Sequence, residues 1–520
     1  MEGTLLSLLP PVITIALTII TKRILLSLGV GIIFGALLAN GWNVAASVSS
    51  IVSIMGTILG EESSIFWFVL IIGAMSALIY LSGGIHAFSK WAVKKVKTPF
   101  QAKLVALLLG FVSFFDDAFS CLFRGSVIKP LTDQYKVSHS KLAYLLHSTS
   151  APVIILMPIS SWAAFIAALM ATIFVDNGIT QYQGYEAFLL TIPTNYYALS
   201  TIILVFVVAY FGINLGQMKR DEKRAQEEGI LFDTSRGTVP GQSAEELPAK
   251  SDGRLLDLFV PVGILVAVTV FLAARGGIAA TEGAITPFKV LMNADVLGAL
   301  VIGGLLACAF SIIRLLTRKT AAGDIAKAVY TGVKSVLPSV LILFMALMTA
   351  EVIGLLGVGQ YLASLIDGNM SLMWLPVIFF ILSAFMSFSM GSTFGTFGLM
   401  LPIGAEIVAI IDVAYLIPVF GAVLAGCIFG EHSSPLSDTT ILAAIGAGVH
   451  PIDHLMTQMP YAMVSSAVSI VGYVTLGFTK SITIGLIAML VTLTVIIIAL
   501  VKFREKSPAG NEAMLKTTEL

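Results

Sequence analysis

Long apolar segments constrain this chain more than any other feature. A helix that crosses the hydrocarbon core of a bilayer takes roughly 17 to 25 residues. Segments of about this length lie near 5–20, 24–38, 65–81, 196–213, 256–273, 295–315, 336–356, 461–476 and 482–501. Charged residues make up only 12% of the chain, whereas soluble domains carry about 25%. The sequence therefore predicts an all-α polytopic membrane protein.

Two longer stretches, 104–174 and 375–445, are apolar but interrupted by polar residues. Basic residues tend to stay on the cytoplasmic side of a membrane, and here they cluster at 22–23, 90–97, 129–141, 219–254, 314–334 and 502–506. All these clusters share one side only if the N-terminus is outside, the C-terminus is cytoplasmic, and each interrupted stretch contains a re-entrant hairpin. We therefore expect hairpins at about 104–128 and 375–410, with tips at SFFDDAFS (113–120) and SFSMGSTFGTF (387–397).

Each predicted hairpin precedes a helix broken by polar residues and proline, at about 142–174 and about 416–445. The halves are weakly similar: FVSFFDDAFSCLFRGSVIKPL pairs with FMSFSMGSTFGTFGLMLPI, and HSTSAP with HSSP, in the same order. Such a pattern with opposite membrane orientation is typical of an inverted repeat, which puts a binding site at the bilayer midplane. We expect a first repeat over 1–218, a solvated cytoplasmic linker over 219–255, a second repeat over 256–478, and a final helix and cytoplasmic tail over 479–520, with about 11 crossings in all.

The stretch FGEHSSPLSDTT (429–440) places ionisable side chains in apolar surroundings, where an unpaired charge costs several kcal/mol. Pro435 should open the helix and free carbonyl groups, and carboxylates, carbonyls and hydroxyls together suit a small hard cation or a proton. The alternatives are a helix N-cap for Asp438 and, for the serines and threonines, hydroxyls bonded back to their own helix. The candidate proton and cation ligands of this stretch are Glu431, His432, Ser433, Ser434, Ser437, Asp438 and Thr439.

Adjacent acids, Asp116 and Asp117, occupy the first predicted tip. In a partly dry setting they should share protons that an entering cation displaces, whereas on a surface they would form a solvated turn. Small polar residues fill the second tip and the first break, where they suit either an anionic group near helix N-termini or tight helix packing. These candidates are Ser148, Thr149, Ser150, Ser389, Ser392 and Thr393. We expect Na+ at Asp116, Asp117, Asp438 and Ser437.

Arg124 lies seven residues beyond Asp117. It either neutralises the acid pair, holds a substrate carboxylate, or extends to the cytoplasmic surface near Lys129. His450 and His454 have the spacing of a zinc-binding helix, but the sequence has proline where a zinc protease has its glutamate, so a cytoplasmic loop is the better account.

These motifs resemble the NhaC-type Na+/H+ antiporter family of the wider ion-transporter superfamily. FGEHSSPLSDTTILAA is similar to that family's F-G-D-H-C-S-P-I-S-D-T-T pattern, and SFFDDAFS, STSAPVIILMPISSW and GSTFGTFGLMLPI are similar to its other polar segments. The resemblance spans most of 24–477 and matches Asp116, Asp117, Glu431, His432, Ser437 and Asp438. The chain departs from the pattern at Glu431, where aspartate is usual, at Ser433, where cysteine is usual, and at 121–124, which replaces an apolar stretch.

The resemblance implies a secondary active transporter, not an enzyme, that exchanges Na+ or Li+ for protons by alternating access in a bacterial inner (plasma) membrane. The ions are cargo, and no cofactor is expected. An alternative on the same fold is coupled transport of an organic acid, amino acid or drug, which Arg124 and the two tips would favour. Membrane lipid and a small inorganic cation are the expected partners, with a small organic solute as the alternative cargo. The 30 basic and 30 acidic residues cancel and so do not favour nucleic acid, while the large apolar faces permit a homodimer.

Overall fold

Helices make up all the regular structure of the described chain. The computed structural model describes residues 4–21, 23–61, 63–114, 117–233, 235, 252–281, 290, 294–358, 361 and 371–503. The first group of helices is α1 (Leu9–Thr21), α2 (Ile24–Ala39), α3 (Val44–Glu61), α4 (Ser63–Leu81), α5 (Gly84–Lys95), α6 (Pro99–Val112), α7 (Asp117–Gln134), α8 (His139–Ser148), α9 (Ala151–Ile154), α10 (Ser161–Asp176), α11 (Gly184–Thr191), α12 (Tyr196–Phe211) and α13 (Gln217–Glu227). The second is α14 (Leu256–Ala280), α16 (Val296–Thr317), α17 (Ala322–Leu356), α19 (Leu375–Met390), α20 (Thr393–Ile411), α21 (Leu416–Ser433), α22 (Asp438–Ala447), α23 (Pro451–Thr479) and α24 (Ile482–Phe503).

Many of these helices are long and apolar enough to cross a bilayer. In hydrocarbon the backbone must satisfy its own hydrogen bonds, and a helix does so within one segment. Among the described residues, 8 helices are long and apolar enough to cross a membrane. The helices α11 and α12, which meet at a bend of 48°, would form a ninth span if they are counted together. The helices α1 and α2 have only 13 and 16 residues, short of a full span. The chain is thus a multi-pass membrane protein, and the expected 11 crossings stay a prediction.

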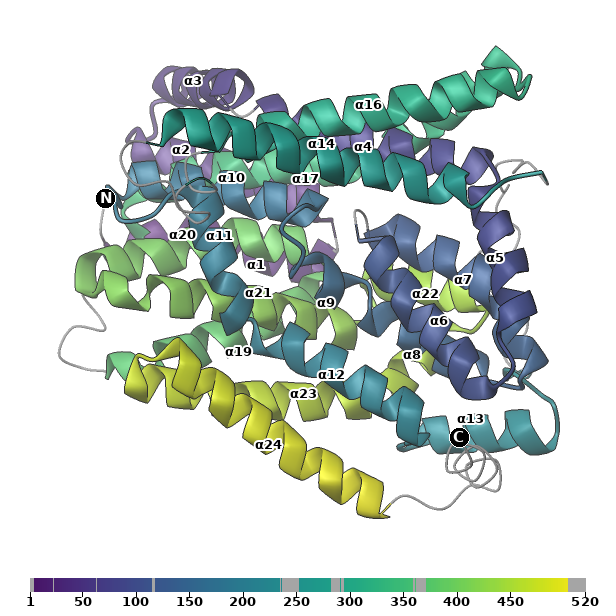
Figure 1. Ribbon diagram of the computed structural model, residues 1–520. Coiled ribbons are helices and arrows are strands. Elements are labelled where there is room, and N and C mark those ends of the chain that lie inside the picture. Colours follow the sequence, from purple (N-terminus) through teal and green to yellow (C-terminus); the bar gives the residue numbers. More distant parts are fainter. Residues whose placement is uncertain are drawn as a thin grey trace.

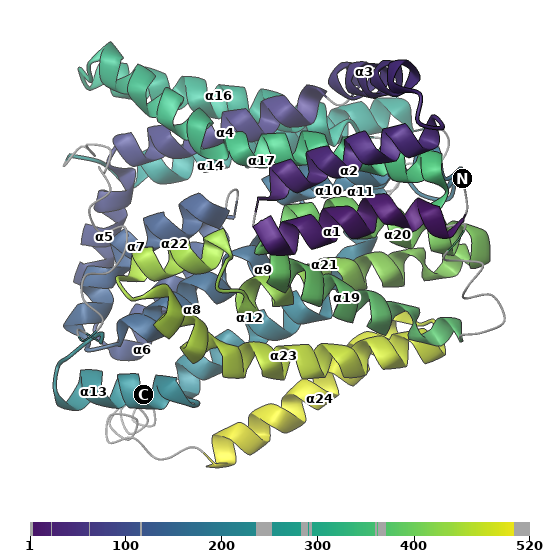
Figure 2. The same cartoon turned by 180° about the vertical axis from the view of Figure 1, so that it is seen from behind.

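The helices lie in layers around a buried centre. The α14 and α16 helices, with α4, lie along one side, and α23 and α24 lie along the opposite side (Figures 1 and 2). Of the α21 span 83% is buried, compared with 17% of the α24 span. The apolar helix α24 is therefore at the periphery, whereas α21, which carries the polar stretch at 429–440, is in the core.

Helix breaks occur within the regions where the sequence predicts hairpins and broken helices. The α6 and α7 helices are joined at 113–116, and α19 and α20 at Gly391–Ser392. The second helix of each pair packs against part of a broken helix from the other half of the chain. The α7 helix packs against α22, and α20 packs against α10. A Cβ at Gly125 of α7 would lie 2.3 Å from the backbone of Gly446 in α22, while Trp162 and Phe165 of α10 pack on Phe394.

The predicted linker begins with an ordered helix rather than a solvated coil. Glu222 of α13 accepts hydrogen bonds from the backbone nitrogen and hydroxyl of Ser138, at 2.8 and 2.7 Å. Asp221 accepts from the Ser140 hydroxyl at 2.6 Å. Both acids are buried, and their carboxylates accept from Ser138, the N-cap of α8, and from Ser140 in its first turn. This part of 219–255 is thus a helix with one face buried and with Lys219, Arg220 and Lys223 exposed, and 236–251 lies outside the described residues.

Replacing Glu222 with alanine should destabilise the protein, because it leaves the N-cap of α8 without its charged acceptor, at a cost of about 1–3 kcal/mol. We expect a lower melting temperature of the purified protein in detergent. Glu227→Ala is the matched control, since Glu227 lies on the same helix with its side chain exposed. Equal melting temperatures for the two variants would contradict the docking role of α13.

Candidate functional site

The polar centre forms where two helix ends meet. The α8 helix ends at Ser148 and α21 ends at Ser433, and each is followed by a short break before the next helix. Proline at 152 and 435 prevents either helix from continuing regularly. The imidazoles of His147 and His432, each next to its helix end, have ring centroids 4.4 Å apart. The two breaks, one from each half of the chain, therefore lie side by side.

Glu431 carries the buried carboxylate of this centre. It is 1% exposed, and the hydroxyl of Thr439 donates a hydrogen bond to its Oε1. The Thr439 hydroxyl also lies 2.8 Å from the Ser437 hydroxyl. Among the described residues Oε2 has no hydrogen-bond partner. One oxygen of the buried carboxylate thus accepts from the Thr439 hydroxyl, while the other has no hydrogen-bond partner among the described residues.

His147 brings the first half of the chain to the same carboxylate. Its Nε2 lies 3.3 Å from the Thr439 hydroxyl and 3.6 Å from Glu431 Oε1. The amide nitrogen of Gln458 lies 2.9 Å from the carbonyl of His432, an acceptor only, and 3.0 Å from His147 Nδ1. Because the amide donates to both, His147 Nδ1 is an acceptor, and the proton of the neutral ring is assigned to Nε2. His147 therefore presents a donor to the hydroxyl and carboxylate of the other half.

Asp438, predicted as a principal acid, is placed differently from Glu431. It begins α22, its side chain is exposed, and its Oδ1 accepts from the Thr439 nitrogen at 2.8 Å. The N-cap is Ser437, whose hydroxyl accepts from the Thr440 nitrogen at 3.3 Å. The N-cap alternative for Asp438 is therefore wrong. The site has one buried acid, Glu431, before the break and one exposed acid, Asp438, directly after it.

The first predicted tip is described only in part. Asp116 lies outside the described residues. Asp117 begins α7 with a partly buried side chain, and its carbonyl accepts from the Ser150 hydroxyl at 3.2 Å. The first tip is thus joined to the first helix break.

Arg124 is buried, so the predicted extension to the cytoplasmic surface is wrong. Its side chain is 0% exposed. The guanidinium donates to the Thr149 hydroxyl at 2.6 Å, the Leu146 carbonyl at 2.7 Å and the Ser120 carbonyl at 3.1 Å. These acceptors lie at the end of α8 and on α7, so Arg124 joins these two helices. The feature that favoured an organic anion as cargo is thus occupied within the protein.

The second tip meets the second break through backbone contact. Gly391 has a φ of +66°, and a Cβ there would lie 2.6 Å from the backbone of Leu436, so glycine fits where a side chain would not. The hydroxyl of Ser434 donates to the carbonyl of Phe388 at 2.6 Å. Ser392 caps α20, Ser389 is partly buried, and Thr393, Ser433 and Ser148 are buried. The tip supports the break that carries the acids.

Residues that the sequence did not identify as site residues complete the centre. His454 is 0% exposed within α23, and its Nε2 lies 3.0 Å from His147 Nδ1, so its assignment to a cytoplasmic loop is wrong. Tyr197 places its hydroxyl 3.0 Å from His432 Nδ1. The pairing of HSTSAP with HSSP could have indicated His147 as the counterpart of His432, whereas no local pattern indicates Gln458 or Tyr197.

Thr439→Val should lower the melting temperature, because the isosteric change removes the hydroxyl that donates to a buried carboxylate, at a cost of about 1–3 kcal/mol. Thr475→Val is the control, since the Thr475 hydroxyl donates only to the Val471 carbonyl of its own helix. Thermal unfolding of both variants in one detergent makes the comparison. Equal shifts would argue against a hydroxyl-held carboxylate at Glu431.

The chain is similar to known membrane transport proteins in sequence and in fold. The model of the Na+/H+ antiporter family matches residues 153–478. A protein of Haemophilus influenzae, described as uncharacterized, is 38% identical over 506 residues, which is 95% of each chain. The crystal structure of the YdaH transporter of Alcanivorax borkumensis is similar with a TM-score of 0.52 and 13% identity, covering 83% of this chain and 88% of that one. At that identity the likeness shows the fold alone.

Multi-pass helices, a buried polar centre at two helix breaks and this fold define a secondary membrane transporter rather than an enzyme. The chain belongs to the Na+/H+ antiporter family.

Proposed function

We propose that the protein exchanges Na+ for protons and that the buried carboxylate of Glu431 binds both in turn. The observation that carries this proposal is an acid at 1% exposure with one oxygen held by Thr439 and the other without a hydrogen-bond partner among the described residues. An ionised carboxylate is costly in a nonpolar interior, so it binds either a proton or a cation. Na+ is a hard cation that takes oxygen ligands, which the carboxylate and the Ser437 and Thr439 hydroxyls offer.

The other acids predicted from the sequence as cation ligands also belong to the proposed ion path. Asp438, exposed at the start of α22, receives the ion before it reaches Glu431. Asp117 supplies a further carboxylate from the α7 side, and α7 packs against α22. Asp116 belongs to the proposed pair, although it lies outside the described residues. The cation thus passes from an exposed acid to a buried one.

Alternating access by two inverted repeats is the proposed mechanism. The reciprocal packing of α7 on α22 and α10 on α20 supports the repeat, because equivalent parts of each half contact the other half. His147 of the first half also contacts Thr439 and Glu431 of the second half. Movement of one half against the other would open the centre to opposite sides in turn.

The proposed orientation in a bacterial inner membrane puts the N-terminus outside. The helix α13 and the C-terminal end of α24 lie at the same end of the bundle (Figure 1). The basic residues at 219–224 belong to α13, and the basic cluster at 502–506 begins at the end of α24. By the preference of basic residues for the cytoplasm, this end is cytoplasmic.

Glu431→Gln should abolish exchange, because an amide neither releases a proton nor supplies a negative ligand. In liposomes with a trapped pH dye and an imposed proton gradient, Na+ or Li+ should dissipate the gradient through the unmodified protein and not through this variant. Asp438→Asn should slow exchange, and Glu227→Gln, an exposed change on α13, should leave it unchanged. No response of the unmodified protein to Na+ or Li+ would reject antiport, and full activity of Glu431→Gln would move the site elsewhere.

The apparent affinity for Na+ should rise with pH. Since the proton and Na+ compete for one carboxylate, acid conditions favour the protonated form, and each unit of pH below the pKa of the acid should weaken Na+ binding about tenfold. Above that pKa the affinity should level off. Measuring the half-saturating Na+ concentration of exchange across a pH series tests this, and a half-saturating concentration that does not vary with pH would contradict competition.

A further inference from the structure

A continuous chain of hydrogen bonds leads away from Glu431 through side chains of both halves of the protein. The Thr439 hydroxyl donates to Glu431 Oε1. His147 Nε2 lies 3.3 Å from the Thr439 hydroxyl, and His147 Nδ1 lies 3.0 Å from His454 Nε2. Each of the four side chains is at most 1% exposed. The hydrogen-bond chain therefore runs through the interior, from the carboxylate to α23.

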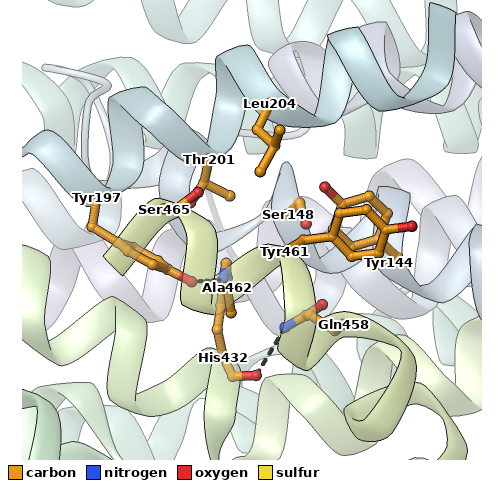
Figure 3. A pocket seen from close by; sticks show the side chains of 10 residues that line it. All are labelled: Tyr144, Ser148, Tyr197, Thr201, Leu204, His432, Gln458, Tyr461, Ala462 and Ser465. Carbon is orange, nitrogen blue, oxygen red and sulfur yellow. Dashed lines mark hydrogen bonds between the residues drawn. The ribbon is translucent and has the colours of Figure 1, made fainter. Parts of the chain in front are cut away.

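Gln458 fixes the direction of these hydrogen bonds. Its amide nitrogen lies 2.9 Å from the His432 carbonyl, which can only accept (Figure 3), and 3.0 Å from His147 Nδ1. His147 Nδ1 is therefore an acceptor. His454 Nε2 faces the same lone pair, so it must carry a proton, because two nitrogens without a proton between them would repel each other. The proton of the neutral His454 ring thus lies on Nε2, and its Nδ1 has none.

Every donor of the hydrogen-bond chain then points toward Glu431. His454 donates to His147 through Nε2, and His147 donates to Thr439 through its own Nε2. Thr439 donates its single hydroxyl proton to Glu431. Its lone pairs accept from His147 and from Ser437, whose hydroxyl lies 2.8 Å away. Because hydrogen bonds aligned in one direction polarise one another, this arrangement suits the transfer of a proton to an ionised carboxylate.

The far end of the hydrogen-bond chain is His454 Nδ1, which has no hydrogen-bond partner among the described residues. His454 lies in the first turn of α23. The residue before it, Asp453, has its Oδ1 3.4 Å from the Gln217 amide nitrogen of α13. In the orientation proposed above, the end of the bundle with α13 faces the cytoplasm. A buried nitrogen without a partner is uncommon, and this one can accept a proton from the cytoplasmic side.

We propose that His454 and His147 form the path by which protons pass between the cytoplasmic side and Glu431. A proton that His454 receives on Nδ1 displaces its Nε2 proton to His147 Nδ1. His147 then gives its Nε2 proton to the Thr439 hydroxyl, which passes its own proton to Glu431. Each of the three relaying groups gains one proton and loses one, and transfer in reverse restores the starting arrangement.

The path rests on the proposed function and gives the proton a route of its own. Two imidazole rings offer nitrogen, whereas Na+ takes oxygen ligands, so the cation does not follow this route. Na+ instead reaches Glu431 past Asp438. Loss of the path should therefore affect proton transfer and leave Na+ movement intact.

Two exchange reactions in liposomes test the path. Na+/H+ exchange moves protons, whereas exchange of radioactive Na+ for unlabelled Na+ moves no net proton. His454→Gln keeps an amide that can donate to His147 but cannot take up one proton and release another. It should slow Na+/H+ exchange about a hundredfold and leave Na+/Na+ exchange unchanged. His450→Gln is the matched control, since His450 is the partly exposed N-cap of the same helix, and it should change neither reaction.

The outcomes separate the path from the proposed function. Full Na+/H+ exchange by His454→Gln would overturn the path alone. An equal loss of both reactions would also overturn it, because it would show that His454 has a structural role. Absence of Na+/H+ exchange from the unmodified protein would reject the proposed function and the path together.

Nuclear magnetic resonance of protein labelled with the heavy nitrogen isotope at histidine tests the path without transport. We expect His147 and His454 to carry their protons on Nε2 and to show a scalar coupling across the N–H···N bond between them. His454→Gln should remove this coupling, and His450→Gln should retain it. A proton on His454 Nδ1, or no coupling in the unmodified protein, would overturn the proposal.

Discussion

The cost of a carboxylate in a nonpolar interior governs the arrangement of this protein. Glu431 lies at 1% exposure in the most buried of the spans found among the described residues, where its carboxylate contacts the Thr439 hydroxyl and the His147 imidazole. In a continuous helix the backbone groups would all be hydrogen-bonded within the helix, and none could face Glu431. The chain instead ends α21 at Ser433 and begins α22 at Asp438. Thr439 then faces back to Glu431 across the break. The helix break therefore supplies the hydroxyl group that compensates the buried acid.

The same constraint explains why both halves of the chain are needed. His147 from α8 contacts Thr439 and Glu431, and Gln458 from α23 fixes the acceptor face of that imidazole. Arg124 secures the end of α8 to α7, while Gly391 lets the turn between α19 and α20 approach the Leu436 backbone. The first break is thus supported by α7 and the second by the turn between α19 and α20. Within the described residues, the polar centre combines groups from both halves of the chain.

The membrane class, the apolar helices and the positions of the two breaks could be predicted from the sequence, because hydrophobic length and proline act locally. Long-range pairing could not. The contacts of His454 and Gln458 with His147 join residues 307 and 311 positions apart, and nothing in VHPIDHL distinguishes a buried first helical turn from a loop. The helix α13 was missed for the same reason. Its charged composition is typical of a solvated segment, yet Asp221 and Glu222 are buried because Ser138 and Ser140 of α8 supply their donors.

Where α7 meets α22, Gly125 and Gly446 touch backbone to backbone, with no side chain between them. Ridges of side chains normally interlock two helices and resist displacement along their axes. At Gly125 and Gly446 no side chain interlocks the two helices, so a small shear would require no change of rotamer at this one point of close approach. The two halves of the chain therefore approach each other closely along the same two helices that begin with Asp117 and Asp438.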